Sequence, residues 1–259
     1  MCTSGPDPTG LDQDVVLASR FSLGEKLFIL TLETREMFSR VQPGQFVLLR
    51  TAAGLDPLLG RPFAICGQEG NRIEIIVAVA GRGTRLLADS ALGVRLSLRG
   101  PLGNGFPEST KSRTHCLAGA VGIAPFLLAR QQNGESEIHL GVPGQDWEPL
   151  VNWVSERIHG LHVYSEDGKL GNRGNPLLCL DGLDPRSDVV WACGPTGMLK
   201  AVSAVCGKRQ IAAWVSLETR MACGMGGCHG CVVQTVDGPK KTCTDGPVFH
   251  SQEVLWNAS

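Results

Sequence analysis

The sequence has almost no net charge and no long apolar run, and each absence excludes a class of protein. Its 24 lysines and arginines are matched by 25 aspartates and glutamates, and no basic cluster stands out. A surface for nucleic acid or for an anionic membrane is therefore not expected. No apolar run reaches the roughly 18 residues of a membrane span, and no basic segment followed by an apolar core opens the chain. These absences predict a soluble cytoplasmic protein.

Internal repeats, low-complexity stretches and Pro/Ser-rich linkers are absent as well. The 259 residues suffice for two or three compact units, and without flexible linkers we expect these units to pack tightly. The 33 glycines and 15 prolines stay below the roughly 25–30% typical of disordered chains. They indicate many tight turns and several loops that approach a ligand closely.

Ten cysteines are present, and four of them follow the spacing C-x4-C-x2-C-x11-C. The first two gaps are typical of a plant-type 2Fe–2S site, in which a more distant fourth cysteine completes the iron ligands. The glycines between them permit positive φ angles and direct N–H groups at sulfur. The predicted metal ligands are Cys223, Cys228, Cys231 and Cys243.

A structural zinc site with four cysteine ligands is the main alternative, since thiolates bind zinc as well. Zinc ribbons usually carry two C-x2-C pairs, whereas this segment has one, so the spacing favours iron and sulfur. His229 lies between two ligands and has no second histidine at matching spacing, which disfavours a Rieske centre. The cysteines interpreted as small apolar residues or inert thiols are Cys2, Cys66, Cys116, Cys179 and Cys206.

Short runs rich in aliphatic and β-branched residues, separated by glycine, proline or aspartate, fill the first hundred residues. Six such runs at close spacing predict an antiparallel barrel. They are VVLASRFSL, LFILTL, QFVLLR, FAIC, IEIIVAVA and RLSLRG.

Two motifs within these runs suit an anion. Arg61, at the mouth of a predicted strand and followed by Pro62, has the fork geometry that grips a pyrophosphate. On its own, a surface arginine before an edge strand is the simpler interpretation. Gly81, Gly83 and Thr84 open a short helical run, where exposed N–H groups attract an anion. Neither motif is specific alone, and the value of the second comes from lying just downstream of the first.

From Thr114 the pattern changes to apolar strands that alternate with helical stretches, which predicts a parallel sheet flanked by helices. A turn of small residues follows the first of these strands and would let a dinucleotide pyrophosphate approach the next helix. It departs from the GxGxxG fingerprint. The turn contains Gly119, Gly122, Ile123, Ala124 and Pro125.

Six motifs occur in the order in which ferredoxin-reductase-like flavoproteins carry them: RPFAI, GRGT, GPLGNGF, AGAVGIAP, CGPTGM and the cysteine segment with its DGPVF tail. The chain resembles this family from about Val15 to Trp256, and within it resembles the electron-transfer subunits of type B dihydroorotate dehydrogenase. The resemblance implies a multi-domain α/β plus all-β fold of three units. These are an antiparallel FAD-binding β-barrel (residues 1–110), a parallel α/β NAD-binding domain (111–208) and a small C-terminal 2Fe–2S domain (209–259).

Site residues follow from the resemblance position by position. The implied FAD residues are Arg61, Pro62, Phe63, Ala64, Ile76, Val77, Ala78, Gly83 and Thr84. The implied NAD residues are Gly119, Gly122, Ile123, Ala124, Pro125, Glu166, Asp167, Cys193, Gly194 and Pro195, with Cys193 near the nicotinamide. Ala64 departs from the Ser or Thr of relatives, whose hydroxyl bonds near flavin N5. FAD binding is still expected, while the effect of Ala64 on the redox properties of the flavin is left open.

The acidic pair Glu166 and Asp167 bears on the choice of nucleotide. It follows a strand, where it would repel a 2′-phosphate and accept bonds from ribose hydroxyls, favouring NAD over NADP. A solvated turn explains the pair equally well. Arg173 nearby weakens the discrimination, because an arginine accommodates that phosphate.

The resemblance implies an electron-transfer subunit of pyrimidine biosynthesis, linking NAD+ to an FMN-containing dihydroorotate dehydrogenase subunit through FAD and a 2Fe–2S cluster. It implies two copies of each subunit, and the balanced charge argues against nucleic acid or a membrane as partner. No residue is expected to act as a catalytic acid or base, because the cofactors carry the redox chemistry. Two alternatives stay open: an NAD(P)H-dependent ferredoxin or sulfur reductase subunit of the same family, and a non-enzymatic zinc-binding protein.

Overall fold

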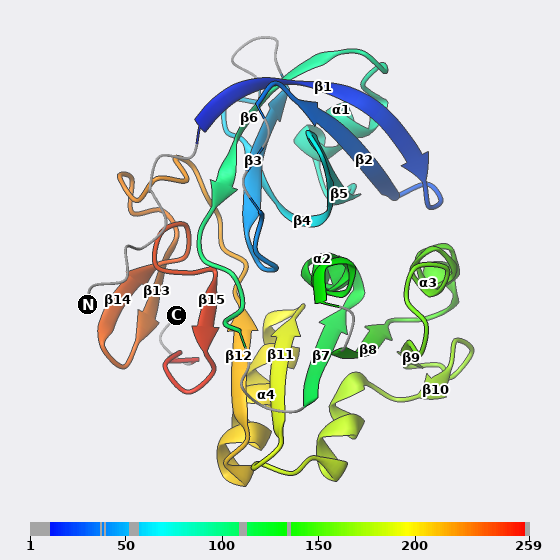
Figure 1. Cartoon of the computed structure of the whole chain (residues 1–259), viewed down its shortest axis with the longest axis vertical. Helices are drawn as coiled ribbons and strands as arrows, with labels where there is room; N and C mark the ends of the chain where they lie inside the picture. Colours follow the sequence, from blue (N-terminus) through cyan, green and yellow to red (C-terminus); the bar gives the residue numbers. More distant parts are fainter. Residues whose placement is uncertain are drawn as a thin grey trace.

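The first of two large sheets is a closed antiparallel barrel, drawn in blue and cyan at the top of Figure 1. The computed structural model describes residues 11–36, 38, 40–51, 57–108, 113–133 and 136–256, so Cys2 lies outside the described residues. The order β1-β2-β5-β4-β3-β6 confirms the predicted six-stranded barrel. Its strands are β1 (Leu11–Ser22), β2 (Leu27–Thr34), β3 (Phe46–Thr51), β4 (Arg61–Glu69), β5 (Arg72–Ala78) and β6 (Arg95–Leu102).

Alternation along the strands builds the barrel core. In β2, Leu30 and Leu32 are fully buried inside the barrel, whereas Thr31 and Glu33 are only partly buried, as the two-residue period of a pleated strand requires. Helix α1 (Arg82–Asp89) connects β5 to β6 and packs Leu87 into the same core. The barrel is thus filled by side chains.

The second sheet has seven strands in the order β10-β9-β8-β7-β11-β12-β15, and all its pairs are parallel except β12 with β15. This confirms the predicted parallel α/β region. Its strands are β7 (Arg113–Gly119), β8 (Ser136–Val142), β9 (His162–Ser165), β10 (Asn172–Arg173), β11 (Asp188–Cys193), β12 (Ala212–Ser216) and β15 (Val248–His250). The connecting helices are η1 (Ala120–Ile123), α2 (Ala124–Asn133), η2 (Gln145–Trp147), α3 (Glu148–Ser155), η3 (Pro176–Gly182) and α4 (Thr196–Arg209).

The helices cover the two faces of this sheet separately. Side chains of α2 and α3 pack with one set of strand residues, including Cys116 and Ile138, while η3 and α4 pack with the opposite set, including Leu117 and Val190. The chain runs outward from β7 through β8 and β9, then returns to β11 on the other side of β7. The point between β7 and β11 is therefore where the strand order reverses.

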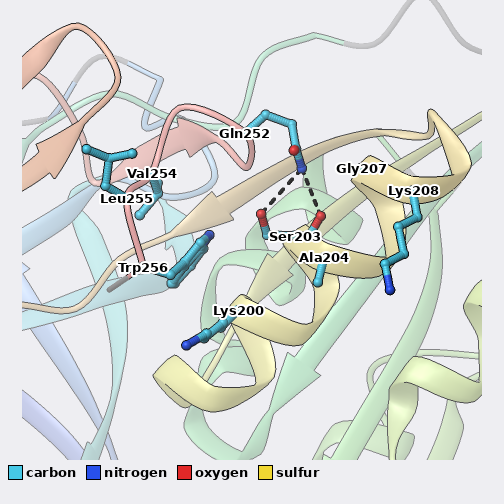
Figure 2. A pocket seen from close by; sticks show the side chains of 9 residues that line it. All are labelled: Lys200, Ser203, Ala204, Gly207, Lys208, Gln252, Val254, Leu255 and Trp256. Carbon is cyan, nitrogen blue, oxygen red and sulfur yellow. Dashed lines mark hydrogen bonds between the residues drawn. The ribbon is translucent and has the colours of Figure 1, made fainter. Parts of the chain in front are cut away.

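The cysteine-rich segment follows β12 as a loop and a small hairpin, β13 (Val232–Thr235) with β14 (Gly238–Lys241), before β15 returns to the second sheet. Beyond β15, the chain lies against α4, where Gln252 Nε2 donates a 2.8 Å hydrogen bond to the Ser203 carbonyl (Figure 2). The pocket drawn there contains none of the predicted cofactor residues. Since β12 and β15 are strands of the α/β sheet, the domain boundary at residue 208 stays a prediction.

The segment from Gly100 to Phe106 joins all three regions. Gln45 Nε2 donates to the Gly103 carbonyl, Asn104 N–H donates to Gly246, and Phe106 stacks on Trp191 with ring centroids 5.0 Å apart. The barrel, the cysteine-rich segment and the α/β sheet are thereby tied at one junction, which agrees with the tight packing expected from the absence of linkers. Within the described residues, no helix has the length and apolar character needed to cross a membrane.

Candidate functional site

The four predicted metal ligands lie on either side of the β13–β14 hairpin as two pairs of thiols, three in the loop before it and Cys243 in the turn after it. Cys231 and Cys243 are buried with sulfur atoms 3.2 Å apart, while Cys223 is partly buried and Cys228 is exposed. All nine described cysteines are free thiols, so none of these four is taken by a disulfide. Two such pairs supply the four sulfur ligands of an iron–sulfur cluster, and the same number of ligands would serve a zinc site.

Backbone N–H groups point at the sulfurs of the exposed pair. Met225 and Cys228 donate to Cys223 Sγ at 3.5 and 3.4 Å, and Gly230 donates to Cys228 Sγ at 3.4 Å. Burial opposes ionisation of Cys223, but these N–H groups outweigh it and lower the pKa of its thiol. A loop that already stabilises thiolate charge is suited to a cluster, whose potential depends on such hydrogen bonds.

The cysteine loop is docked on the outer wall of the barrel. A Cβ added to Gly224 would lie 2.5 Å from Leu48 Cδ1 and 2.9 Å from Leu102 Cδ1, so the loop backbone touches strands β3 and β6 directly. Arg99 on β6 donates from Nη1 to the Cys223 carbonyl at 2.5 Å. These contacts hold the thiols at a fixed position against the barrel.

Arg61 lies against the start of α1 on the same barrel. A Cβ on Gly83 would lie 2.3 Å from Arg61 Nε, which places the guanidinium across the first turn of the helix. Every residue of that first turn is described by the structure, and none of them is acidic. A guanidinium beside helix N–H groups is the arrangement that binds a pyrophosphate, so the residues fit the phosphate end of FAD.

The other predicted flavin residues divide between the two sides of the barrel wall. Ala64, Ile76 and Ala78 face outward into the cluster of apolar residues around η1 and α2, whereas Phe63 and Val77 are buried in the barrel core. Only the outward side chains offer an apolar surface to a flavin ring; Phe63 and Val77 could contribute only backbone atoms. The alternation of β4 and β5 gives the physical reason.

Two turns of the α/β region, here called the glycine turns, follow β7 (residues 119–125) and β11 (residues 193–195). They meet where the strand order reverses, between β7 and β11. A Cβ on Gly119 would lie 2.4 Å from Pro195 Cδ, and a Cβ on Gly122 would lie 2.3 Å from the Cys193 carbonyl oxygen. Such contact allows no side chain at either glycine. In open α/β sheets a ligand binds outside the carboxyl ends of the strands at this point, so the turns occupy the expected position for a dinucleotide.

Cys193 stands at the end of β11 in this crevice. Burial raises the pKa of its thiol to about 12, so the group stays neutral near pH 7. A neutral buried thiol behaves as a small apolar side chain rather than a nucleophile.

The acidic turn after β9 lies at the same edge of the sheet, two strands beyond β7. Asp167 accepts the Lys169 N–H at 3.0 Å, and this bond lowers the pKa of its carboxyl. A Cβ on Gly168 would lie 3.0 Å from Arg173 Cβ, so the arginine is close to the acidic turn. The geometry leaves both the nucleotide and the solvated-turn interpretations of Glu166 and Asp167 in place.

The sequence patterns missed the residues that join the regions. Leu48, Leu102 and Arg99 dock the cysteine loop, yet each occurs in an ordinary strand pattern with no motif around it. Only the three-dimensional contact distinguishes them, so no signal in a single sequence could have found them.

Fold and cysteine site together define an oxidoreductase with a flavoprotein reductase fold and an added iron–sulfur binding region. Residues 218–255 match the family described as the iron–sulfur cluster binding domain of dihydroorotate dehydrogenase B. The chain is 35% identical over 252 residues to the dihydroorotate dehydrogenase B (NAD(+)) electron transfer subunit of Geobacillus kaustophilus, covering 93% of this chain and 97% of that protein. The corresponding subunit of Clostridium acetobutylicum is 32% identical, covering 84% and 87%. The chain therefore belongs to the family of electron-transfer subunits of dihydroorotate dehydrogenase B.

Solved structures agree on the fold. An NADH-dependent reduced ferredoxin–NADP oxidoreductase, studied for flavin-based electron bifurcation, superposes with a TM-score of 0.82 at 26% identity, covering 94% of this chain and 90% of that chain. A ferredoxin NADP+ reductase from Neisseria gonorrhoeae with bound FAD and NADP superposes with a TM-score of 0.62 at 19% identity, covering 76% and 91%. The second likeness concerns the fold alone.

Proposed function

We propose that this chain passes electrons between NAD(H) and an FMN-containing subunit that oxidises dihydroorotate to orotate, with NAD+ as the final acceptor in pyrimidine biosynthesis. The observation that carries the proposal is the docking of the cysteine loop on the barrel wall beside Leu48 and Leu102, while Met225 on the same loop is 54% exposed. One side of the metal site is thus fixed against the flavin-type barrel, and the other is open to a partner.

The chain's own residues have the following roles in this proposal. Arg61 and the first turn of α1 hold the FAD pyrophosphate, and Ala64, Ile76 and Ala78 form the apolar surface beside the flavin ring. Glycine turns at the ends of β7 and β11 admit the nicotinamide nucleotide. When bound, FAD would supply exchange between two-electron and one-electron chemistry, and a 2Fe–2S cluster on Cys223, Cys228, Cys231 and Cys243 would supply single-electron transfer.

The proposal is tested on protein purified without oxygen, alone and with the partner subunit. We expect flavin and cluster bands in the visible spectrum of the chain, and NAD+ reduction driven by dihydroorotate only when both subunits are present. A colourless protein with one tightly bound zinc would contradict the proposal and support the zinc alternative. A complex of two copies of each subunit, and a cytoplasmic location, stay predictions.

The four-ligand assignment has its own test. Cys243→Ser should abolish or strongly perturb the EPR signal of the reduced cluster, because a thiolate ligand is lost. Cys206→Ala, which removes a fully buried thiol in the α4 core, serves as the control and should leave the iron content unchanged. An unaltered signal in Cys243→Ser would remove that residue from the ligand set.

A second candidate is a reductase of the same fold that serves a different partner. It is favoured by the likeness to the NADH-dependent reduced ferredoxin–NADP oxidoreductase and by Arg173 beside the acidic turn. Steady-state reduction of ferredoxin with NADH or NADPH, compared with activity in the dihydroorotate complex, separates the two candidates.

A further inference from the structure

Three histidines stand in a row across adjacent strands on the η3 face of the α/β sheet. His115 on β7, His139 on β8 and His162 on β9 stack with ring centroids 5.8 Å and 4.8 Å apart. Their neighbours Cys116, Ile138 and Val163 pack toward α2 and α3 on the other face. The row is therefore separate from the cysteine loop and from the glycine turns at the carboxyl ends of the strands.

Two of the three histidines, His115 and His139, are buried and have ring nitrogens without a hydrogen-bond partner among the described residues. His115 is 3% exposed and His139 is 4% exposed. In the part of the chain that the structure describes, three ring nitrogens here lack a hydrogen-bond partner. They are both nitrogens of His115 and Nε2 of His139. Most buried polar groups are satisfied, because leaving one unpaired costs free energy. Several unpaired nitrogens at one place point to a ligand that they share.

Each ring is flanked by a polar group that can orient it. His115 Nε2 lies 3.7 Å from Asp188 Oδ1, and Arg113 and the Asp184 N–H hold that carboxylate in turn. His139 Nδ1 lies 3.4 Å from the Tyr164 hydroxyl. Metal-bound histidines characteristically use one nitrogen for the ion and direct the other at a carboxylate or similar partner. This leaves His115 Nδ1 and His139 Nε2 for a shared ligand.

Glu137 supplies a carboxylate at the same position. Its Oε2 lies 3.5 Å from His115 Nδ1, and its side chain is 49% exposed, so it can adjust and admit solvent. One ligand atom from each of His115, Glu137 and His139 lies within 4.8 Å of the other two. Ligand atoms on one tetrahedral zinc ion are about 3.4 Å apart, since Zn–N and Zn–O bonds are about 2.0–2.2 Å. Glu137 Oε2 and His115 Nδ1 already lie near that spacing at 3.5 Å, and binding of an ion would draw the three side chains closer together.

We propose that His115, Glu137 and His139 form a binding site for a divalent transition metal ion, with Zn²⁺ as the fitting ion and water in the remaining position. Two imidazoles and one carboxylate are a ligand set that zinc uses with an open position. Calcium and magnesium prefer oxygen ligands alone and fit the set poorly. The ion would cross-link β7 and β8 away from the redox cofactors.

The test uses protein that retains its iron and flavin. Zinc binding is measured by equilibrium dialysis with elemental analysis, and the zinc X-ray absorption edge reports the ligand atoms. We expect one zinc per chain beyond the iron, bound by nitrogen and oxygen without sulfur. Glu137→Gln and His139→Gln should each weaken binding by about tenfold or more, the scale seen when even supporting groups of a metal site are changed. His159→Ala removes an exposed histidine after α3 and is the matched control.

Several outcomes would overturn the assignment. They are the absence of stoichiometric zinc, a sulfur ligand in the absorption spectrum, or equal affinity in the wild type and both ligand variants. Glu137 is half exposed, so Glu137→Gln decides the question even where His139→Gln fails to fold. Iron and flavin contents should be unchanged in Glu137→Gln, which separates this site from the proposed electron-transfer function.

Discussion

Gly83 is the residue at which the two proposed flavin motifs touch. Its missing side chain lets the Arg61 guanidinium lie across the start of α1, where a Cβ would come within 2.3 Å of Arg61 Nε. The backbone at Gly83 does not require glycine for its conformation, since no positive φ occurs there. Glycine is therefore needed at this position because any side chain would collide with the Arg61 guanidinium.

Gly83→Val should weaken FAD retention by about tenfold to a hundredfold, because hydrogen bonds to a charged group contribute roughly 1.5–3 kcal/mol. Arg61→Ala should have a similar effect, and the double variant should be little worse than either single variant, since both remove one interaction. FAD content after gel filtration measures the loss. Arg85→Ala, an exposed arginine in the same helix, is the control. Fully additive losses would show that Gly83 does not act through Arg61.

At the scale of elements, the sequence predicts those whose side chains alternate or recur locally. The six barrel strands and helices α2, α3 and α4 are of this kind. The short η3 and the two-residue β10 escape prediction because they are too short to show a period. The position of β15 escapes for another reason. Val248, Phe249 and His250 pair with β12, which lies more than thirty residues earlier, and nothing local encodes that pairing.

Gly122→Ala tests the contact between two elements, the turns after β7 and β11. The added Cβ would meet the Cys193 carbonyl oxygen at 2.3 Å, and a backbone atom cannot swing away. We expect the turns to separate and hydride transfer from NADH to FAD to slow by about tenfold to a hundredfold, the effect of a misplacement near 1 Å. Stopped-flow flavin reduction measures the rate. Gly182→Ala, where a Cβ meets nothing within 4 Å, is the control. An unchanged rate in Gly122→Ala would move the nicotinamide site elsewhere.

At the scale of the whole molecule, the local residue patterns of the candidate sites are readable from the sequence, but the contacts that join the sites are not. The cysteine spacing and the glycine turns are local and were visible in the sequence. The docking of the cysteine loop on Leu48 and Leu102, and the bond from Arg99 to the Cys223 carbonyl, join segments more than a hundred residues apart. These contacts fix the metal site against the barrel and leave its outer side exposed.

Met225→Glu tests whether that exposed side is the exit for electrons. The loop from residue 222 to residue 230 has no aspartate, glutamate, lysine or arginine, and Met225 is 54% exposed beside the thiols. If a partner covers the loop, the new carboxylate becomes buried and unpaired, which costs several kcal/mol. Dihydroorotate-driven NAD+ reduction in the two-subunit complex should then fall by about a hundredfold at low protein concentration.

Reduction of an artificial dye by NADH should be unchanged in Met225→Glu, because that reaction needs no partner subunit. Val236→Glu is the matched control, since Val236 is 61% exposed but lies in the turn between β13 and β14 rather than in the cysteine loop. This variant should keep both activities. Equal loss of both activities in Met225→Glu would indicate damage to the metal site itself. Retention of both would place the electron exit on another surface of the chain.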